Sequence, residues 1–591
     1  MPKTDLVIRV AGEAGEGVLS TGQLLVQAAA RAGYRVLTDF SPPAEIKGGY
    51  SLFQLRIGSH QFYSRGDQVD VLLCMNQEAF DLSIDDLAEG GLLIYDPGEL
   101  QPPTSPSREQ YGVPFSEIAR TQLKFELGKN VVAVGALAAL FGLPEEYIQK
   151  LLQQRFGGRG ADILTKNEAA LQAGLGYVRE HVLSAPGFTA ERYAVERGEP
   201  ARDRIVLSGN QAVSLGALAA GVEFFAGYPI TPASDIMEFL AAELPKVGGS
   251  VIQAEDEIAS INMVLGASFA GKRAMTSTSG PGVSLMIEAL GLGAMAELPC
   301  VLVDAQRAGP STGMPTRHEQ GDLFMAATGG HGDIQRIVLA PTSVEDCFYQ
   351  VQNAFNLADK YQMPVIVLQD TVLAVRNESI PRPDPNRIPR QTRLLYQPNG
   401  NGHGAPPPHE GYFSRYALTE SGISPVSVPG QPGGQYVATG LEHSEEGRPR
   451  YDPVTKREMT EKRMKKLAAA PQDAPEAEYW GDPAAEIGII TWGSTAGPVQ
   501  EAIRLAAAEG IRVAGMAPKM LWPVAAGQIE PFLQGKQDVL VAEVNYSGQF
   551  ADILAARFGR PFEKLTVYAG EAFRVRDILA AIRAQARAAV R

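Results

Sequence analysis

Short apolar runs alternate with amphipathic segments along most of the chain. DLVIRVAG at residues 5–12 and YRVLTDF at 34–40 lie on either side of a segment with helical spacing, and the apolar runs DVLLCMN and GGLLIYDP follow. This order predicts β-α-β units, and continuous apolar runs are typical of strands that are buried on both faces of a parallel sheet. The predicted fold class is therefore α/β.

Two interruptions of this pattern predict three domains. Residues 187–204 are polar and irregular, so a boundary there ends a first domain over 1–195 and opens a second over 200–385. Residues 386–480 are rich in Pro, Gly and Asn, a composition that ordinarily indicates disorder or a long surface excursion. The β-α-β pattern then returns over 481–591.

Polar and glycine residues follow the apolar runs of the second domain between residues 227 and 322. CVLVD at 300–304 is a predicted buried strand, and Arg307 follows it directly. Open α/β sheets bind ligands at the carboxyl ends of their strands, where a guanidinium can hold a carboxylate with two parallel hydrogen bonds. Arg317 is the second choice for this role, because Glu319 or Asp322 could pair with it. This stretch is the predicted active site.

Two further residues of this stretch carry specific chemistry. Pro229 and Pro232 restrict the backbone around Thr231, which places its hydroxyl on a stiff loop. Glu257 begins a helix rich in Ala and Gly, so close packing is expected to fix its position. A carboxylate that enters an apolar setting suits proton exchange. Glu255 is the competing candidate, and a lone glutamate or arginine is more often a surface charge.

Composition excludes several classes of function. A net charge of -14 and a pI near 5.2 argue against nucleic-acid binding, which needs clustered Lys and Arg. The longest apolar run, VVAVGALAALFGL at 131–143, is shorter than the roughly 18 residues that suggest a membrane span. The first residues lack the apolar core of a signal peptide, so a cytoplasmic location is expected. Three widely spaced cysteines cannot hold a [4Fe-4S] cluster alone, which needs four thiolates.

Two loops of the first domain are candidates for ligand binding. Gly12, Gly15 and Gly17 have the spacing G-x-x-G-x-G, and the neighbouring glutamates would place carboxylates where a pyrophosphate should lie, so a nucleotide site is disfavoured. SPPAEIKGGYSLF at 41–53 predicts a shaped loop with Lys47 at its tip. This lysine is either an ordinary solvated side chain or a long cation that reaches a ligand.

The motifs YPITP, TSTSGPG, the Glu257 helix and the Arg307 loop together resemble the thiamine-diphosphate 2-oxoacid:ferredoxin oxidoreductases. The resemblance is to the alpha subunit with its gamma domain fused in front, and it covers nearly the whole chain. It implies a gamma domain over 1–195, a pyrimidine-binding domain over 200–385 and a transketolase C-terminal-like domain over 481–591. It also implies that the linker over 386–480 is an ordered meander. The charges of its basic helix, KREMTEKRMKKL, favour a solvated face over a nucleic-acid patch.

The resemblance also implies roles for individual residues. Glu257 is the expected catalytic residue and hydrogen-bonds the pyrimidine ring of thiamine diphosphate, and Thr231 and Arg307, with Thr316, hold the C1 carboxylate of the 2-oxoacid. Lys47 would meet a second carboxylate, which favours 2-oxoglutarate over pyruvate or a branched-chain 2-oxoacid. The cofactor-binding set is Tyr228, Pro229, Ile230, Thr231 and Glu257, and the possible interface residues of the last domain are Glu543, Asn545 and Gln549.

The sequence contains no Gly-Asp-Gly and no Asn-Asn pair, which together form the usual Mg²⁺-diphosphate signature of thiamine enzymes. The cofactor is therefore expected to be shared with a beta subunit that supplies Mg²⁺ and a [4Fe-4S] cluster. The implied reaction converts a 2-oxoacid and CoA to an acyl-CoA and CO₂ while ferredoxin is reduced, or runs in reverse and fixes CO₂. A dimer of alpha-beta heterodimers is the expected assembly, and a subunit that has lost its chemistry is the non-enzyme alternative.

Overall fold

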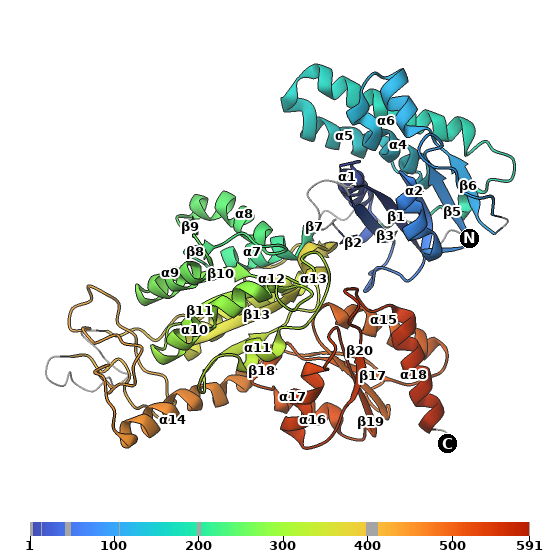
Figure 1. Cartoon of the computed structure of the whole chain (residues 1–591). Coiled ribbons are helices and arrows are strands. Elements are labelled where there is room, and N and C mark those ends of the chain that lie inside the picture. The colour runs from blue at the N-terminus through green and yellow to red at the C-terminus, as the bar shows by residue number, and fades with distance from the viewer. Residues whose placement is uncertain are drawn as a thin grey trace. The chain divides into compact units, whose positions relative to one another are not determined.

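The computed structural model describes residues 4–13, 15–41, 49–105, 107–196, 198, 203–397 and 412–589. The chain forms two compact units (Figure 1). The first unit contains Met1–Leu207, Val375–Arg382 and Arg574–Arg576, and the second contains the rest of the chain. The described residues form three sheets covered by helices, which confirms the predicted α/β class.

An eight-stranded sheet organises the first unit in the order β6-β5-β4-β1-β3-β2-β14-β7. Its strands are β1 (Asp5–Glu13), β2 (Arg35–Ser41), β3 (Tyr50–Gly58), β4 (Val69–Cys74), β5 (Leu87–Tyr95), β6 (Glu109–Gly112), β7 (Arg204–Ser208) and β14 (Asn377–Pro381). The expected β-α-β unit is more complex than predicted, because β3 pairs antiparallel with both β1 and β2 and separates them. β7 and β14 lie outside the range expected for the first domain, yet they extend its sheet.

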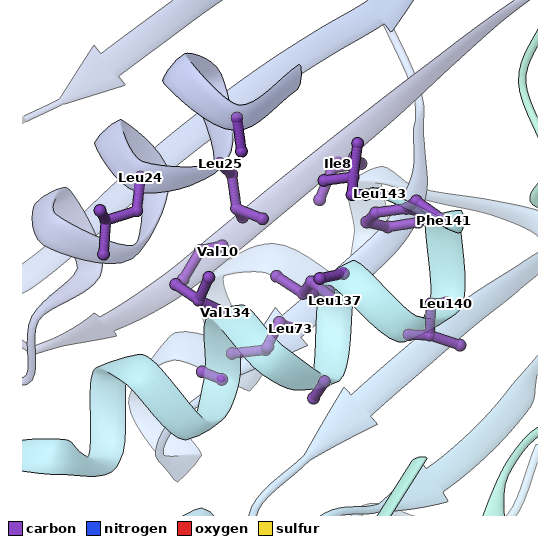
Figure 2. Close-up of a cluster of buried hydrophobic side chains, with 14 of the residues drawn as sticks. Ile8, Val10, Leu24, Leu25, Leu73, Val134, Leu137, Leu140, Phe141 and Leu143 are labelled. Carbon is purple, nitrogen blue, oxygen red and sulfur yellow. The ribbon is translucent and has the colours of Figure 1, made fainter. Parts of the chain in front are cut away.

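The longest apolar run of the sequence is the core helix of this unit. It forms α4 (Lys129–Phe141), whose apolar side chains pack with those of α1 (Val18–Arg31) and β1 (Figure 2). Gly135 lets α6 (Ala161–His181) approach closely, since a Cβ there would lie 2.3 Å from the carbonyl oxygen of Leu171. α5 (Glu145–Phe156) begins directly after Pro144. Within the described residues, no helix has the length and apolar character that crossing a membrane requires.

A glutamate fills the glycine-rich loop that follows β1. Glu16 accepts hydrogen bonds from the backbone N–H of Glu13 at 2.8 Å and from Asn76 at 2.7 Å, and its other oxygen lies 2.9 Å from Lys129 Nζ. Its carboxylate therefore occupies the donors that a phosphate would use. This arrangement agrees with the expectation that the loop is not a nucleotide site.

A seven-stranded sheet organises the larger part of the second unit, in the order β18-β12-β13-β11-β10-β8-β9. Its strands are β8 (Phe224–Gly227), β9 (Ser250–Gln253), β10 (Ala274–Thr278), β11 (Cys300–Gln306), β12 (Ile337–Leu339), β13 (Pro364–Asp370) and β18 (Met520–Trp522). The associated helices are α7 (Gly209–Ala219), α8 (Ser234–Glu243), α9 (Glu257–Phe269), α10 (Gly280–Met295), α11 (Leu323–Thr328) and α12 (Val344–Tyr361) (Figure 1). All pairings are parallel except that of β18 with β12, and every residue of β11 is buried, as the sequence predicted.

The last part of the chain forms a five-stranded sheet in the order β15-β17-β16-β19-β20. Its strands are β15 (Glu478–Gly481), β16 (Ile487–Thr491), β17 (Ala514–Ala517), β19 (Asp538–Glu543) and β20 (Glu563–Thr566), with helices α15 (Ala496–Ala508), α16 (Ala526–Leu533), α17 (Gln549–Phe558) and α18 (Val575–Ala589). β18 leaves this region to join the seven-stranded sheet, and β15 comes from the linker. The pairing of β18 with β12 thus joins the two sheets.

The basic helix of the linker has the solvated face that was predicted, on which Arg457 and Lys465 are exposed, but its opposite face is buried and also carries charges. It forms α14 (Pro453–Ala469), and Lys462, Arg463 and Lys466 are each buried. Lys462 and Lys466 lie 2.6 and 2.7 Å from the carboxylate of Glu297, just beyond the end of α10, and Arg463 pairs with Glu442 at 2.9 Å. The pattern of charges along one helix shows which faces are charged. It cannot show that a carboxylate far away in the sequence will be buried against one of them.

Glu297→Gln is expected to destabilise this unit by about 3–5 kcal/mol near neutral pH, because two buried ammonium groups lose their counter-charge. Burial alone would raise the pKa of Glu297, but Lys462 and Lys466 outweigh it and hold this pKa well below its ordinary value. The stabilisation is therefore present above the ordinary pKa of 4.5 and is lost as the pH falls below it.

Thermal unfolding of the variant and the wild type across pH measures this effect. Glu288→Gln is the matched control, since Glu288 is exposed on α10. Equal melting temperatures for Glu297→Gln and wild type at neutral pH would contradict the role assigned to Glu297.

Candidate active site

The predicted site residues of the second domain come together at the carboxyl ends of neighbouring strands. The YPITP loop follows β8, α9 follows β9, the Gly-Pro-Gly turn that begins α10 follows β10, and Arg307 follows β11. Because β9, β8, β10 and β11 are consecutive and parallel, their carboxyl ends share one edge of the sheet. This edge is where open α/β sheets bind ligands.

Glu257 is the first residue of α9, as predicted, and its side chain is only 6% exposed. Asp256 caps the helix by accepting a 2.7 Å hydrogen bond from the backbone N–H of Ala259. The competing Glu255 is exposed. The difference in burial between Glu255 and Glu257 favours Glu257 as the functional carboxylate.

A glycine that sequence reasoning missed creates the space for Glu257. A Cβ at Gly282 would lie 2.9 Å from Glu257 Oε1 and 2.0 Å from Thr278 Oγ1. The carboxylate therefore rests directly on the backbone of the α10 N-terminal turn, and any larger residue would displace it. The signal that could have identified Gly282 was its place in TSTSGPG, because the sequence predicts no turn that would require a second glycine there.

Among the described residues, nothing packs closely on the outer face of α9 at Gly266. The expectation rested on Ala and Gly residues that include Gly266, but a Cβ at Gly266 would meet nothing within 4 Å among the described atoms. Ile258 and Met263 are 49% and 39% exposed on the same helix. The buried side of α9, which packs on β8 and β10, is what holds Glu257 in place.

The side chain of Arg307 contacts the backbone of the YPITP loop. Its Nη1 donates a 2.8 Å hydrogen bond to the carbonyl oxygen of Thr231, and its side chain is 8% exposed. Thr231 itself is exposed, as are Tyr228 and Pro229, whereas Ile230 is half-buried. The structure thus places Thr231 beside Arg307, as a shared contact with one substrate carboxylate would require. Ala233 begins α8 without a side-chain cap, as its sequence predicts.

The loop that follows Arg307 is closed by its own backbone. The N–H of Ala308 donates to the carbonyl of Arg317 at 3.0 Å, and Gly309 donates to the carboxylate of Glu319 at 2.8 Å. Thr316 and Arg317 are half-buried in this loop. The backbone of Arg317 therefore stabilises the loop that Arg307 begins.

The C-terminal sheet fastens this loop through residues that were expected at an interface. Asn545 donates to the carbonyl of Gln320 at 3.1 Å, and Gln549 donates to that of Gly321 at 2.7 Å. The carboxylate of Glu543 accepts from Asn545 at 2.8 Å and from the backbone of α17. All three are buried inside the chain. Their contacts hold the loop that follows Arg307, and the sequence could not show this because Gln320 lies more than 200 residues away.

Two buried aspartates lie beneath Arg307, and sequence reasoning assigned neither of them a role in the site. Asp304 on β11 is 0% exposed, and the nearby carboxyl group of Asp322, at the end of the loop, acts on it electrostatically. Burial and the neighbouring Glu319 raise the pKa of Asp322 to about 7, although Arg307 opposes this. Burial also lowers the pKa of Arg307. Asp322 was considered as a partner of Arg317, but its charge acts on Arg307. The available signal was an aspartate inside the apolar run CVLVDAQ.

Lys47 lies outside the described residues, so its role stays a prediction. His318 is buried with its Nε2 3.4 Å from the hydroxyl of Ser494, and His331 is exposed.

The described residues fit one half of a thiamine-diphosphate site. A buried glutamate on a glycine-lined turn suits a protonatable ring nitrogen, and an exposed Tyr-Pro-Ile-Thr loop adjoins it. In the described part of the chain, no group of three or more His, Cys, Asp or Glu side chains could hold a metal ion. Cys74, Cys300 and Cys347 are all buried, and none of them forms a disulfide.

Three family models match successive parts of the chain. Residues 7–177 match the pyruvate ferredoxin/flavodoxin oxidoreductase model, and residues 215–463 match the thiamine-diphosphate-binding model of pyruvate flavodoxin/ferredoxin oxidoreductases. Residues 485–578 match core domain II of pyruvate:ferredoxin oxidoreductase.

Relatives over nearly the full length carry related names. Subunit alpha of 2-oxoacid:ferredoxin oxidoreductase 2 from Aeropyrum pernix is 32% identical over 93% of each chain. The 2-oxoglutarate oxidoreductase subunit KorA of Mycobacterium tuberculosis is 33% identical over 98% of this chain and 91% of its own. A solved 2-oxoglutarate:ferredoxin oxidoreductase from Magnetococcus marinus, with 2-oxoglutarate, coenzyme A and succinyl-CoA bound, is 42% identical. It covers 99% of this chain and 100% of its own with a TM-score of 0.91.

These matches confirm the resemblance read from YPITP, TSTSGPG and the Arg307 loop, and the names of the relatives indicate one subunit of a larger enzyme. The chain belongs to the 2-oxoacid:ferredoxin oxidoreductase family, as an alpha-type enzyme subunit.

Proposed function

We propose that this chain, with a partner subunit, oxidatively decarboxylates 2-oxoglutarate with CoA. The products are succinyl-CoA and CO₂, and the two electrons released pass singly to ferredoxin; the reverse reaction fixes CO₂. The observation that carries this proposal is the buried Glu257 on Gly282 at the same sheet edge as the Arg307–Thr231 contact. The Magnetococcus marinus enzyme, which binds 2-oxoglutarate, supports the choice of substrate.

Glu257 is assigned to the thiamine-diphosphate pyrimidine ring. The bound cofactor supplies a carbon nucleophile for the keto carbon of the substrate and accepts the electrons that remain after CO₂ is lost. Glu257 holds a proton at a pyrimidine ring nitrogen, and its burial strengthens this hydrogen bond because the local dielectric is low. Gly282 keeps the carboxylate in one position, and Tyr228, Pro229 and Ile230 line the approach to it.

Arg307, Thr231 and Thr316 are assigned to the C1 carboxylate. One Arg307 nitrogen is already ordered by the carbonyl of Thr231, which leaves its remaining donors oriented at little further entropic cost. Lys47 is assigned to the second carboxylate of the substrate, and pyruvate and branched-chain 2-oxoacids lack this group.

A beta subunit is proposed to supply what this chain lacks. Three buried cysteines cannot hold a [4Fe-4S] cluster, and the diphosphate needs Mg²⁺ with oxygen ligands. The exposed apolar and small residues of α9, which include Ile258, Met263 and Gly266, are a suitable surface for that subunit next to Glu257. The proposed assembly is a dimer of alpha-beta heterodimers.

Substrate choice is tested by CoA-dependent viologen reduction with the co-expressed beta subunit. 2-Oxoglutarate, pyruvate and 2-oxoisovalerate are compared in parallel, and the kcat/KM for 2-oxoglutarate is expected to be highest. Lys47→Ala should lower this value by about 10–100-fold and leave the value for pyruvate nearly unchanged, because one charged hydrogen bond contributes about 1.5–3 kcal/mol.

Lys129→Ala is the matched control, because Lys129 is a lysine of the same domain whose charge is already paired with Glu16. An active complex with no 2-oxoglutarate activity would refute both the substrate and the role of Lys47. An equal loss with all three substrates would refute the role of Lys47 alone.

A further inference from the structure

Buried oxygen atoms gather beneath Arg307 without donors to satisfy them. Both carboxyl oxygens of Asp304 and Oδ2 of Asp322 are buried and accept no hydrogen bond from any described N–H or O–H group. Asp304 is 0% exposed. Buried carboxylates without hydrogen-bond donors are destabilised, and two of them side by side repel each other, so two ionised groups cannot both persist here.

A shared proton resolves this arrangement. The two carboxyl groups lie within hydrogen-bonding reach of each other, so a protonated Asp304 can donate to Asp322. Gly280, the first glycine of TSTSGPG, provides the room, since a Cβ there would lie 2.7 Å from Asp322 Oδ2. The pair is therefore built into the strand ends and is not an accidental contact between flexible side chains.

Arg307 couples this pair to the substrate position. The ionised form of Asp322 attracts the Arg307 guanidinium, which in turn favours that ionised form. A substrate carboxylate that binds Arg307 would compete for the same positive charge and would repel the ionised pair. By thermodynamic linkage, an anion bound at Arg307 must therefore favour protonation of the pair.

We propose that Asp304 and Asp322 are positioning residues that act as a proton reservoir, taking up one proton from solvent when a 2-oxoacid carboxylate binds to Arg307. For each substrate carboxylate that binds, one proton moves from solvent to Asp322, while Asp304 stays protonated. The pair would hold Arg307 in place before the substrate arrives and release it without leaving a buried negative charge. This inference rests on the proposed role of Arg307.

The other charged groups around the pair are few. Glu319 on the same loop raises the pKa of Asp322, and Glu257 lies on the far side of the α10 turn, against Gly282. On the adjacent strand, Asp370 accepts hydrogen bonds from Gln320 and from the backbone N–H of Ser494. His318 lies 3.8 Å from Asp370. Asp322 is thus the group placed to respond at Arg307, and its pKa of about 7 sets the range in which it does so.

Calorimetry of the assembled complex tests the proposal directly. The probe is 2-hydroxyglutarate, which keeps both carboxylates of 2-oxoglutarate but has no keto carbon. Its binding heat is measured in two buffers of different ionisation enthalpy, because the difference counts the protons taken up. About one proton per site is expected about one unit above the pKa of Asp322, with weaker binding by up to about tenfold for each further pH unit.

Three variants identify the group that takes up the proton. Asp322→Asn should abolish the buffer dependence, whereas Asp304→Asn should retain it because the amide can still donate to Asp322. Glu319→Gln, the matched control beside Asp322, should also retain proton uptake, with a midpoint at lower pH. If a variant fails to assemble, the proton uptake of the wild-type complex still tests the proposal.

The outcomes separate this inference from the proposed function. Binding that Arg307→Lys weakens, but whose heat is the same in both buffers, would overturn the proton reservoir and leave the role of Arg307 intact. Uptake that persists in Asp322→Asn would also overturn it. Binding that Arg307→Lys does not weaken would refute the assignment of Arg307 itself, and the inference with it.

Discussion

Glu257→Gln is expected to lower kcat by about 10²–10⁴-fold, the usual contribution of a positioned proton-transferring group. Glutamine has nearly the same shape, so it can occupy the space above Gly282 without disturbing the α10 turn. It cannot hold an exchangeable proton as a carboxyl group does. Steady-state viologen reduction by the assembled complex measures the loss, and the affinity for 2-hydroxyglutarate should hardly change.

Glu255→Gln is the matched control for this prediction. Glu255 is exposed and lies two residues earlier, so its replacement should leave kcat within about twofold of the wild type, as expected for a surface change. Near-normal turnover of Glu257→Gln would reject Glu257 as the catalytic residue. A large loss in Glu255→Gln would instead transfer the role to that residue.

Arg307→Lys is expected to lower kcat/KM for the 2-oxoacid by about 10–150-fold, which corresponds to the roughly 1.5–3 kcal/mol of a charged hydrogen bond. Lysine keeps the charge but loses the planar fork, and its ammonium cannot donate in parallel to Thr231 and to a carboxylate. Most of the loss should appear in KM if the contact forms before the chemical step, and in kcat if it forms only in the transition state.

Arg317→Lys provides the comparison in the same loop. The carbonyl of Arg317 closes the loop, and a side-chain replacement keeps this backbone contact. Its kcat/KM should therefore stay close to that of the wild type. A larger loss in Arg317→Lys than in Arg307→Lys would mean that Arg317 binds the carboxylate, which was the second choice from the sequence.

The contacts of Gln320 explain why the third domain matters for the site. Gln320 donates to Asp370 at 3.1 Å and to the carbonyl of Trp492 at 3.0 Å, and it accepts from the backbone N–H of Val544 at 3.0 Å. The loop that begins at Arg307 is thus held by both the seven-stranded and the five-stranded sheet. The C-terminal region shapes the active site from within the chain.

Local sequence determined much of this protein. Apolar runs gave the buried strands, the alternation with helices gave the α/β class, and Glu257 and Arg307 were placed correctly at a helix start and a strand end. These predictions succeeded because burial and periodicity are properties of short segments. The limited cysteine count and the missing metal motif also needed only the sequence.

Tertiary structure alone decided which distant residues meet. The pairing of β18 with the seven-stranded sheet, the burial of Lys462 and Lys466 against Glu297, and the Asp304–Asp322 pair each join segments whose local patterns give no sign of the other. Strand order and loop closure set these contacts, and both depend on the packing of the whole unit. The sequence therefore located the residues of the site, whereas the fold determined the charges and the backbone that surround them.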